Sequence, residues 1–187
     1  MSSSSSPTPL PQPAEVVAFW RDAGPQQWFS KNAAFDAEFR RRFESAHIAA
    51  AARELDDWLG DSTGALALMV LLDQFPRNAY RGTAHMFATD PLARYCAEYA
   101  IGVGHDLAVE AQLRQFFYLP FEHAEDLEAQ ERGVALMEAL GGDTLRWAVL
   151  HRDIIKRFGR FPHRNAALGR LTTPAEQAFL DGGGFSG

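Results

Sequence analysis

Basic and histidine side chains are concentrated near the carboxyl end of the chain. Residues 151–170 contain six Lys or Arg, two His and a single acid, so this stretch has a net charge of +5. The other residues carry 12 bases and 23 acids, a net charge of −11. Imidazoles exchange protons near neutral pH, and guanidinium groups bind carboxylates and phosphates through paired hydrogen bonds. The stretch therefore predicts an anion site or an internal electrostatic clamp.

Six side chains of this stretch are candidate site residues. Asp153 and Arg157 are four residues apart on a predicted helix, which favours an intrahelical ion pair. The same helix places His151 on the face of Trp147, where it could be a hydrogen-bonded core histidine. The other three candidates follow the helix: Arg160, His163 and Arg164. They could clamp the fold, cap the helix end or bind a carboxylate or phosphate, and the sequence leaves these alternatives open.

A second cluster follows an apolar run in the first half of the chain. It consists of Asp73, Arg77, Asn78 and Arg81. Asp73 ends the apolar run, so its burial would require a cationic partner, either Arg77 or an Arg of residues 151–170. The cluster predicts either a buried structural network or the polar floor of a pocket.

Glu122 and His123 form a third candidate pair, followed by Glu125, which we expect in the first turn of a helix. A carboxylate beside an imidazole could orient it for acid–base catalysis, and His123 could equally cap the helix. His123, His151 and His163 could also offer three imidazoles to a zinc ion. The sequence contains no His-Glu-x-x-His or other short metal-binding spacing, so we predict no metal and no cofactor.

Helices must position these residues, because Ala, Leu, Glu and Arg dominate the chain and alternating β-branched runs do not occur. One apolar stripe, Phe35, Phe39 and Phe43, has helical spacing and predicts a core face. Pro76 and Pro120 are expected to stop the helices that precede them. The predicted helices cover residues 14–22, 33–59, 65–75, 90–101, 107–119, 124–140, 145–158 and 174–180. The expected fold class is all-α, with antiparallel helical hairpins in a stack or bundle.

Composition limits the classes of function. The net charge of −6 argues against general binding to nucleic acid or to a membrane surface. The single cysteine, Cys96, excludes a disulfide framework and a thiolate-rich zinc site. No apolar run reaches the roughly 18–20 residues of a membrane span, and the first residues lack a secretory signal, so we expect a cytoplasmic protein. The expected organisation is a disordered Ser- and Pro-rich leader (1–13), a single helical domain (14–180) and a flexible Gly-rich tail (181–187).

Three long motifs resemble those of a known family. They are Leu-Asp-Gln-Phe-Pro-Arg-Asn at 72–78, Phe-Phe-Tyr-Leu-Pro-Phe-Glu-His at 116–123, and the run from His151 to Asn165 that contains Arg-Phe-Gly-Arg-Phe-Pro-His-Arg. In their order and length they are similar to the bacterial family designated domain of unknown function 924, over about residues 16–180. The resemblance implies an all-helical, tetratricopeptide-like fold and no settled activity.

Two functions of different classes follow as hypotheses. In the first, the protein is a binding module whose groove holds an acidic peptide or a small anion, with Arg77, Arg81, Arg160 and Arg164 as anion-facing donors. In the second, it is an enzyme acting on a small anionic substrate, with His123 or His151 as the acid–base group and Asp73 or Glu122 orienting it. If the arginines are instead paired internally and no cavity adjoins them, the clusters are structural. The sequence sets no expectation for the oligomeric state.

Overall fold

The computed structural model describes residues 9–185, and every regular element within that range is helical, which confirms the predicted all-α class. The α-helices are α1 (Pro13–Ala23), α2 (Pro25–Trp28), α3 (Ala33–Ala51), α4 (Ser62–Met69), α5 (Phe75–Ala79), α6 (Asp90–Gly102), α7 (Gln115–Glu122), α8 (Leu127–Glu138), α9 (Gly142–Phe158) and α10 (Pro174–Asp181). Short 3₁₀ turns are η1 (Asp56–Gly60), η3 (Ala84–Phe87), η4 (His105–Ala108), η5 (Ala111–Leu113) and η6 (Pro162–Arg164). The π-helical turn η2 (Val70–Gln74) joins α4 to α5.

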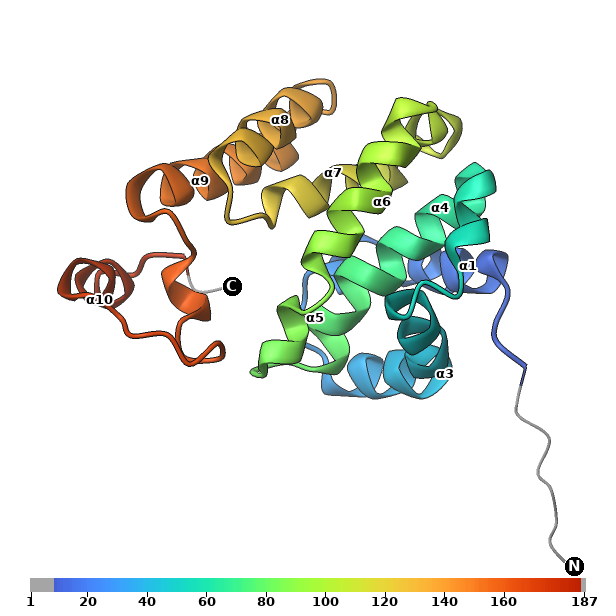
Figure 1. Cartoon of the computed structure of the whole chain (residues 1–187), viewed down its shortest axis with the longest axis horizontal. Coiled ribbons are helices and arrows are strands. Elements are labelled where there is room, and N and C mark those ends of the chain that lie inside the picture. Colours follow the sequence, from blue (N-terminus) through green and yellow to red (C-terminus); the bar gives the residue numbers. More distant parts are fainter. Residues whose placement is uncertain (1–8, 186–187) are drawn as a thin grey trace, which may run out of the picture.

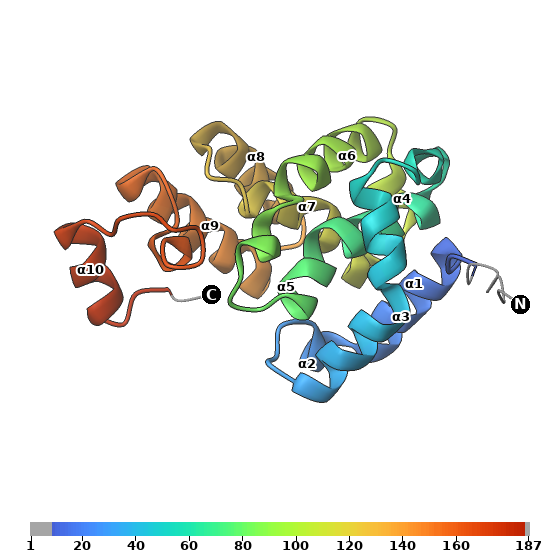
Figure 2. The same cartoon turned by 60° about the horizontal axis from the view of Figure 1, so that its bottom comes forward.

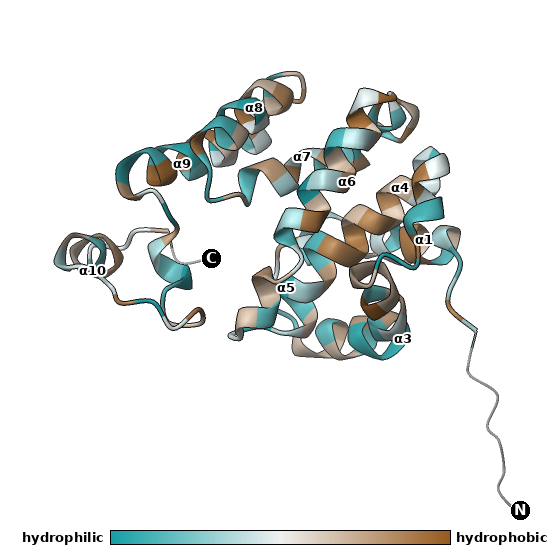
Figure 3. Ribbon diagram, in the orientation of Figure 1, coloured by the Kyte–Doolittle hydropathy of each residue, from teal (hydrophilic) through white to brown (hydrophobic). Residues whose placement is uncertain are grey.

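The core is built around α4, which is buried from Gly64 to Met69 and lies between α1 and α6. Its apolar character is visible in Figure 3, where α4 is largely brown while α3 and α9 carry both teal and brown segments. The predicted stripe on α3 is confirmed as a core face, because Phe39 and Phe43 are buried and Phe35 packs against them. Phe19 of α1 contacts all three of these rings, at 5.2 Å between centroids, stacking on Phe35 and Phe39 and meeting Phe43 at a tilt.

Neighbouring helices continue this packing toward the C-terminus. In the order of the chain, α6 packs on α7, α7 on α8 and α8 on α9. Figure 1 and Figure 2 show α10 at the opposite end of the molecule from α1 and α3. The three motifs singled out in the sequence lie on η2–α5, on α7 and on α9–η6, so helix packing decides whether they meet.

The π-helical turn η2 carries Asp73 and leads directly into α5, which carries Arg77 and Asn78. Its wide ring is closed by the Phe75 amide, which donates to the Val70 carbonyl, five residues back. Pro76 has no amide proton, so the carbonyls of Leu71 and Leu72 lose their regular helical donors. Side chains replace those donors: His47 Nδ1 lies 2.9 Å from the Leu71 oxygen, and the Thr89 hydroxyl donates to that of Leu72. The turn thus continues the helix past a proline.

Two predicted helix stops are therefore wrong. Pro76 lies within the first turn of α5, because the wide turn and its side-chain donors satisfy the backbone there. Pro120 lies inside α7, which ends two residues later at Glu122. Both prolines occupy buried positions. Glu122 and Asn78 consequently lie on helices, where the prediction had placed them beyond helix ends.

Several predicted helices also have different limits. The helix expected over 33–59 ends at Ala51, because Arg53 adopts a left-handed conformation with φ of 65° and a 3₁₀ turn follows. The helix expected over 107–119 is divided into η4, η5 and α7, with Val109 extended between the 3₁₀ turns. Glu125 was expected in a first helical turn and instead lies before α8, whose N-cap is Asp126. A capping box of Thr173 and Glu176 opens α10 close to the predicted start at residue 174.

The predicted leader falls mainly on residues 1–8, outside the described range, and the end of the predicted tail, residues 186 and 187, also lies outside it. Of the residues nearer the ends, Gln12 caps α1 and Phe185 contacts aromatic rings of α9 and η6. Within residues 9–185, no helix combines the length and the apolar character needed to cross a bilayer. The domain limits remain a prediction.

Candidate functional site

Asp73 and His123 form the closest contact between the candidate clusters. Asp73, in the π-helical turn, is completely buried, and its Oδ1 lies 2.7 Å from Nδ1 of His123, the residue that ends α7. Burial alone would raise the pKa of Asp73, but the charge of Arg77 and the contacts from His123 and Gln74 lower it to about 2. Asp73 is therefore an anion that orients the imidazole.

The environment of His123 fixes its protonation. Burial, together with the positive charge of Arg77, lowers its pKa from the usual value, while Asp73 opposes that shift. A neutral imidazole that donates from Nδ1 to a carboxylate keeps its lone pair on Nε2. Gln130 of α8 holds the surrounding backbone, because its amide donates to the carbonyls of Glu122 and Ala124 on either side of His123.

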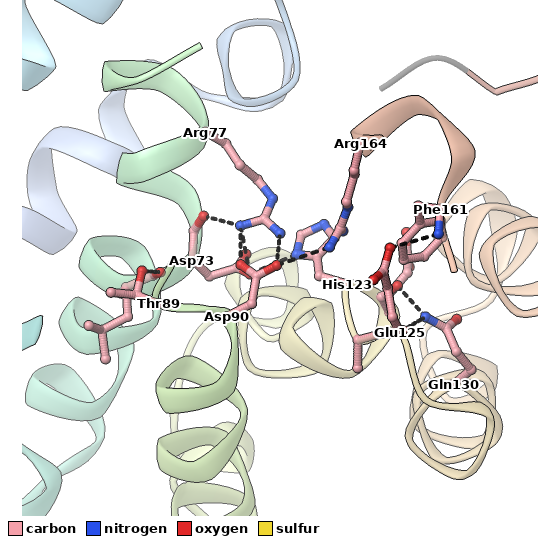
Figure 4. A network of polar contacts seen from close by, with 12 residues as sticks. Asp73, Arg77, Thr89, Asp90, His123, Glu125, Gln130, Phe161 and Arg164 are labelled. Carbon is pink, nitrogen blue, oxygen red and sulfur yellow. Dashed lines mark hydrogen bonds and ion pairs between the residues drawn. The ribbon is translucent and has the colours of Figure 1, made fainter. Parts of the chain in front are cut away.

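An acidic residue, Asp90, connects two of the clusters. Arg77 makes a bidentate pair with it, at 2.9 and 3.0 Å, and also donates to the Asp73 backbone carbonyl at 2.7 Å. Arg164 of η6 reaches the same carboxylate at 3.2 Å, and Figure 4 shows both guanidinium groups beside the Asp90 carboxylate, that of Arg77 above it and that of Arg164 to its right. Residues 73, 77, 90, 123 and 164, which are distant in sequence, thus form one polar network.

Arg164 is held more tightly than a surface arginine. Its side chain is 7% exposed, and its guanidinium carbon lies 4.5 Å from the ring centre of Phe87 and 4.4 Å from that of Phe161. Burial and the charge of Arg77 lower its pKa to about 10, so it stays charged at neutral pH. Because its guanidinium is held between two aromatic rings, Arg164 forms a fixed part of the structure and is not free to turn toward a ligand.

A cavity of about 340 Å³ adjoins this network, between the start of α6, the α7–α8 connection and η6. Its polar lining residues are Asp90, Arg94, His123, Glu125, Asp126 and Arg164, and its apolar lining residues are Ala84, Phe87, Ala88, Pro91, Ala124 and Leu168. The volume lies within the range of small-molecule sites. His123 is the imidazole of this lining, so a base oriented by a carboxylate faces a space of ligand size.

Glu122 and His151 form a second, fully enclosed pair behind His123. Nδ1 of His151 lies 3.0 Å from Glu122 Oε1 and 2.8 Å from the Trp147 carbonyl. Burial, with the charge of Asp73, raises the pKa of Glu122 to about 8, and burial lowers that of His151 to about 3. Burial thus favours the neutral form of both groups, which lie in direct contact.

Comparison with known proteins gives the chain a family. The model of a family described as "Bacterial protein of unknown function (DUF924)" matches residues 16–184. The chain belongs to the DUF924 family. Its fold is also similar to that of ATU0120 from Agrobacterium tumefaciens, described as a protein of unknown function: the TM-score is 0.89 and the sequences are 60% identical, over 91% of this chain and 97% of that one. A comparison with curated proteins found no match.

The DUF924 chain brings together many of the residues predicted from its sequence. Asp73, Arg77, His123 and Arg164 lie in the polar network, while Glu122 and His151 form the enclosed pair behind it. His163 lies beside Phe161, at 5.5 Å between ring centres, and burial lowers its pKa to about 4. Within residues 9–185, no three His, Cys, Asp or Glu side chains are arranged to hold one metal ion.

Other predicted residues of the DUF924 chain lie elsewhere. Arg81 pairs with Asp36 at 2.6 Å and with Asn78, and Arg160 pairs with Glu176 at 2.6 and 2.8 Å. The predicted ion pair of Asp153 and Arg157 is wrong. Asp153 pairs with Arg152, while the guanidinium of Arg157 lies over the rings of Phe158 and Phe179. The neighbouring Arg152 thus took the place of Arg157 as the partner of Asp153, and Arg157 packs on aromatic rings instead.

Sequence reasoning missed four residues of the DUF924 site. Asp90 is the first residue of α6 and was not among the predicted site residues, and Arg94 lies one turn further along the same helix. Arg170 holds Glu125 in a bidentate pair at 2.6 and 2.9 Å, and Glu125 accepts the Phe161 amide at 2.7 Å. The excess of positive charge over 151–170 was a signal that acidic partners must lie elsewhere in the chain, but it did not say where.

Proposed function

We propose that this protein is an enzyme in which His123, oriented by Asp73, acts as a general base on a small molecule bound in the adjoining cavity. The observation that carries the proposal is the 2.7 Å contact from Asp73 Oδ1 to His123 Nδ1, on a ring that lines a cavity of about 340 Å³. This contact favours the tautomer whose Nε2 can accept a proton. The cavity lining contains no Ser, Cys, Thr or Tyr, so the proton would come from water or from the substrate itself.

A small anionic group on the substrate is supported by Arg94. It lies 3.7 Å from Asp126, outside hydrogen-bond distance, and its side chain is 36% exposed at the cavity. Asp90 and Glu125 also line the cavity, but each is neutralised by a bidentate arginine pair. Arg94 is therefore available to bind an anionic group, and the paired acids Asp90 and Glu125 would repel it little. Because Arg94 is a single cation, the cavity favours a substrate of low negative charge.

The binding of an acidic peptide through a row of arginines has less support. Arg77, Arg81 and Arg160 each form two-point contacts with a carboxylate, and Arg164 is enclosed between two rings. A peptide carboxylate would have to displace those partners. The tetratricopeptide-like arrangement and the cytoplasmic location stay predictions, as does a protein or peptide partner.

The test compares the wild type with His123→Asn and Asp73→Asn on p-nitrophenyl esters and phosphoesters. We expect turnover by the wild type and a loss of about 10²–10⁴-fold in His123→Asn, because that is the usual contribution of a general base. His85→Asn, at an exposed imidazole outside the cavity, is the matched control and should keep the wild-type rate. Equal rates for His123→Asn and wild type on every substrate turned over would refute the role of His123.

The pH dependence provides a second check. The base must be neutral to act, and the pKa of His123 lies below the usual histidine value. Activity should therefore persist through pH 6.5 and decline only at lower pH, as His123 becomes protonated. Nitrogen-15 NMR of the histidine rings should find the proton of His123 on Nδ1. A proton on Nε2 would contradict the proposed orientation by Asp73.

A further inference from the structure

Phe185, the last described residue, lies against the site from the side of the C-terminal segment. Its ring centre is 4.5 Å from that of His151, 5.1 Å from that of His163 and 6.1 Å from that of Trp147. The two imidazoles meet the phenyl ring at steep angles, 66° and 82°. Phe185 thus fills a slot whose walls are rings of α9 and η6.

Unpartnered polar atoms accompany this slot. Glu122 is 4% exposed and contacts His151 through Oε1, while its Oε2 is buried and has no hydrogen-bond partner in residues 9–185. Nδ1 of His163, on the opposite wall, is also buried without a partner in that range. Buried polar atoms are normally paired. One of these atoms belongs to a wall of the slot, His163, and the other to Glu122, which contacts the wall residue His151. Their lack of partners indicates that another molecule can supply them.

The segment that carries Phe185 is rich in glycine. It consists of three consecutive glycines, 182–184, which have no side chains to anchor them. Its last backbone contact is the Gly184 amide, which donates to the Phe179 carbonyl at 2.9 Å. A Cβ at Gly184 would lie 2.5 Å from that carbonyl oxygen and 2.6 Å from the Phe179 ring. The present path of the segment therefore requires glycine at 184.

We propose that Phe185 is a built-in plug, and that the slot it fills between His151 and His163 is a binding site for the planar ring of a small ligand with a polar edge. The phenyl group shows that a flat six-membered ring fits there, and the unpaired Nδ1 of His163 offers a hydrogen bond to the ring edge. This site is separate from the cavity beside His123, since none of its walls lines that cavity. The inference therefore goes beyond the proposed function.

The test uses two variants that empty the slot in different ways. Phe185→Ala removes the ring, whereas Gly184→Ala keeps the ring but forces the segment off its path. The probe is nicotinamide, a neutral planar ring with a polar edge, and cyclohexanecarboxamide has the same polar group on a non-planar ring. We expect nicotinamide to bind both variants at least ten-fold more tightly than the wild type, as measured by calorimetry, and cyclohexanecarboxamide to bind neither.

Controls separate the slot from general loosening and from the site at His123. Gly102→Ala, at an exposed helix end where a Cβ meets open space, should bind nicotinamide as weakly as the wild type. NMR shifts on binding should be confined to the region of His151 and His163, and His123→Asn combined with Phe185→Ala should leave the affinity unchanged within two-fold. If both plug variants fold but bind nicotinamide no better than the wild type, Phe185 is a packing residue and the inference is overturned.

Discussion

Asp73 and Glu122 are buried in the same cluster but hold opposite protonation states. Asp73 is paired with Arg77 and His123, and its pKa falls to about 2. Glu122 lacks such pairing, and burial with the nearby charge of Asp73 raises its pKa to about 8. Each state depends on the other, because ionisation of Glu122 would place a second negative charge beside Asp73. At the residue scale, the cluster therefore contains an anionic carboxylate, Asp73, which orients His123, and a carboxylic acid, Glu122, which stays neutral.

Replacement of Glu122 by Gln should change how stability depends on pH. Between pH 4.5 and about 8, the unfolded wild type ionises Glu122 and the folded protein does not, so this group's contribution to stability is lost as the pH rises. Glu122→Gln has no such loss. Relative to the wild type, we expect the variant to gain roughly 2–4 kcal/mol of unfolding free energy between pH 5 and pH 9.

Urea denaturation at both pH values measures this difference. The difference between variant and wild type is the quantity to follow, because the buried histidines also titrate and affect both curves equally. A difference that stays constant from pH 5 to pH 9 would mean that Glu122 is ionised in the folded protein.

The residues of the site could be predicted from sequence better than their partners. Asp73 at the end of an apolar run required a cation, and Arg77, one turn away, was one of the two partners expected, the other being an arginine of residues 151–170. The acids that neutralise the other arginines are far away in the chain: Asp36 for Arg81, Glu176 for Arg160, Glu125 for Arg170 and Asp90 for Arg164. These pairs span 16 or more residues and depend on helix packing, which local spacing does not encode.

At the scale of elements, helix faces were predictable and several helix ends were not. The spacing of Phe35, Phe39 and Phe43 fixed a core face, because helical periodicity follows from backbone geometry alone. Pro76 can lie inside a helix because Thr89 and His47 contact the Leu72 and Leu71 carbonyls, which lack backbone donors next to the proline. A local rule for proline cannot include side chains brought from other helices.

One glycine of α4 lies where α4 and η1 pack too closely to leave room for a side chain. Gly64 of α4 lies so near η1 that a Cβ would be 2.1 Å from the Trp58 carbonyl oxygen. Gly64→Ala should therefore lower the unfolding free energy by about 2–3 kcal/mol through overpacking. The matched change, Gly102→Ala at the open end of α6, should be neutral or stabilise by up to about 1 kcal/mol. Chemical denaturation of both variants measures the contrast, and equal stabilities would show that η1 yields to the added methyl group.

On the scale of the whole molecule, the last helix is attached mainly through charged side chains. Arg160 holds Glu176 of α10 by two hydrogen bonds and also donates to the Leu171 carbonyl at 2.8 Å. Apolar contacts at this end involve the small cluster of Ile154, Ile155 and Phe161, separate from the main core. Local stability should therefore be lower here than around α4.

Removal of the Arg160 clamp should release this end selectively. In Arg160→Ala, we expect amide hydrogen exchange over residues 171–185 to become at least ten-fold faster, while exchange in α4 stays unchanged. Arg160→Lys keeps the charge but not the two-point geometry, and it should be intermediate. Arg41→Ala, which removes an exposed ion pair with Glu38 on α3, is the control. Uniform acceleration across the chain would show that α10 and the main core unfold together.

The π-helical turn between Val70 and Gln74 has a consequence for insertions and deletions. Such a turn contains one residue more than a regular helical turn, and each residue of a helix advances the direction of the side chains by about 100°. Loss of a single residue from this turn would rotate Arg77 by that angle relative to α4, away from Asp90. A shortened chain could thus keep every side chain of the site and still lose the site, because the number of residues in this turn matters as much as their identity.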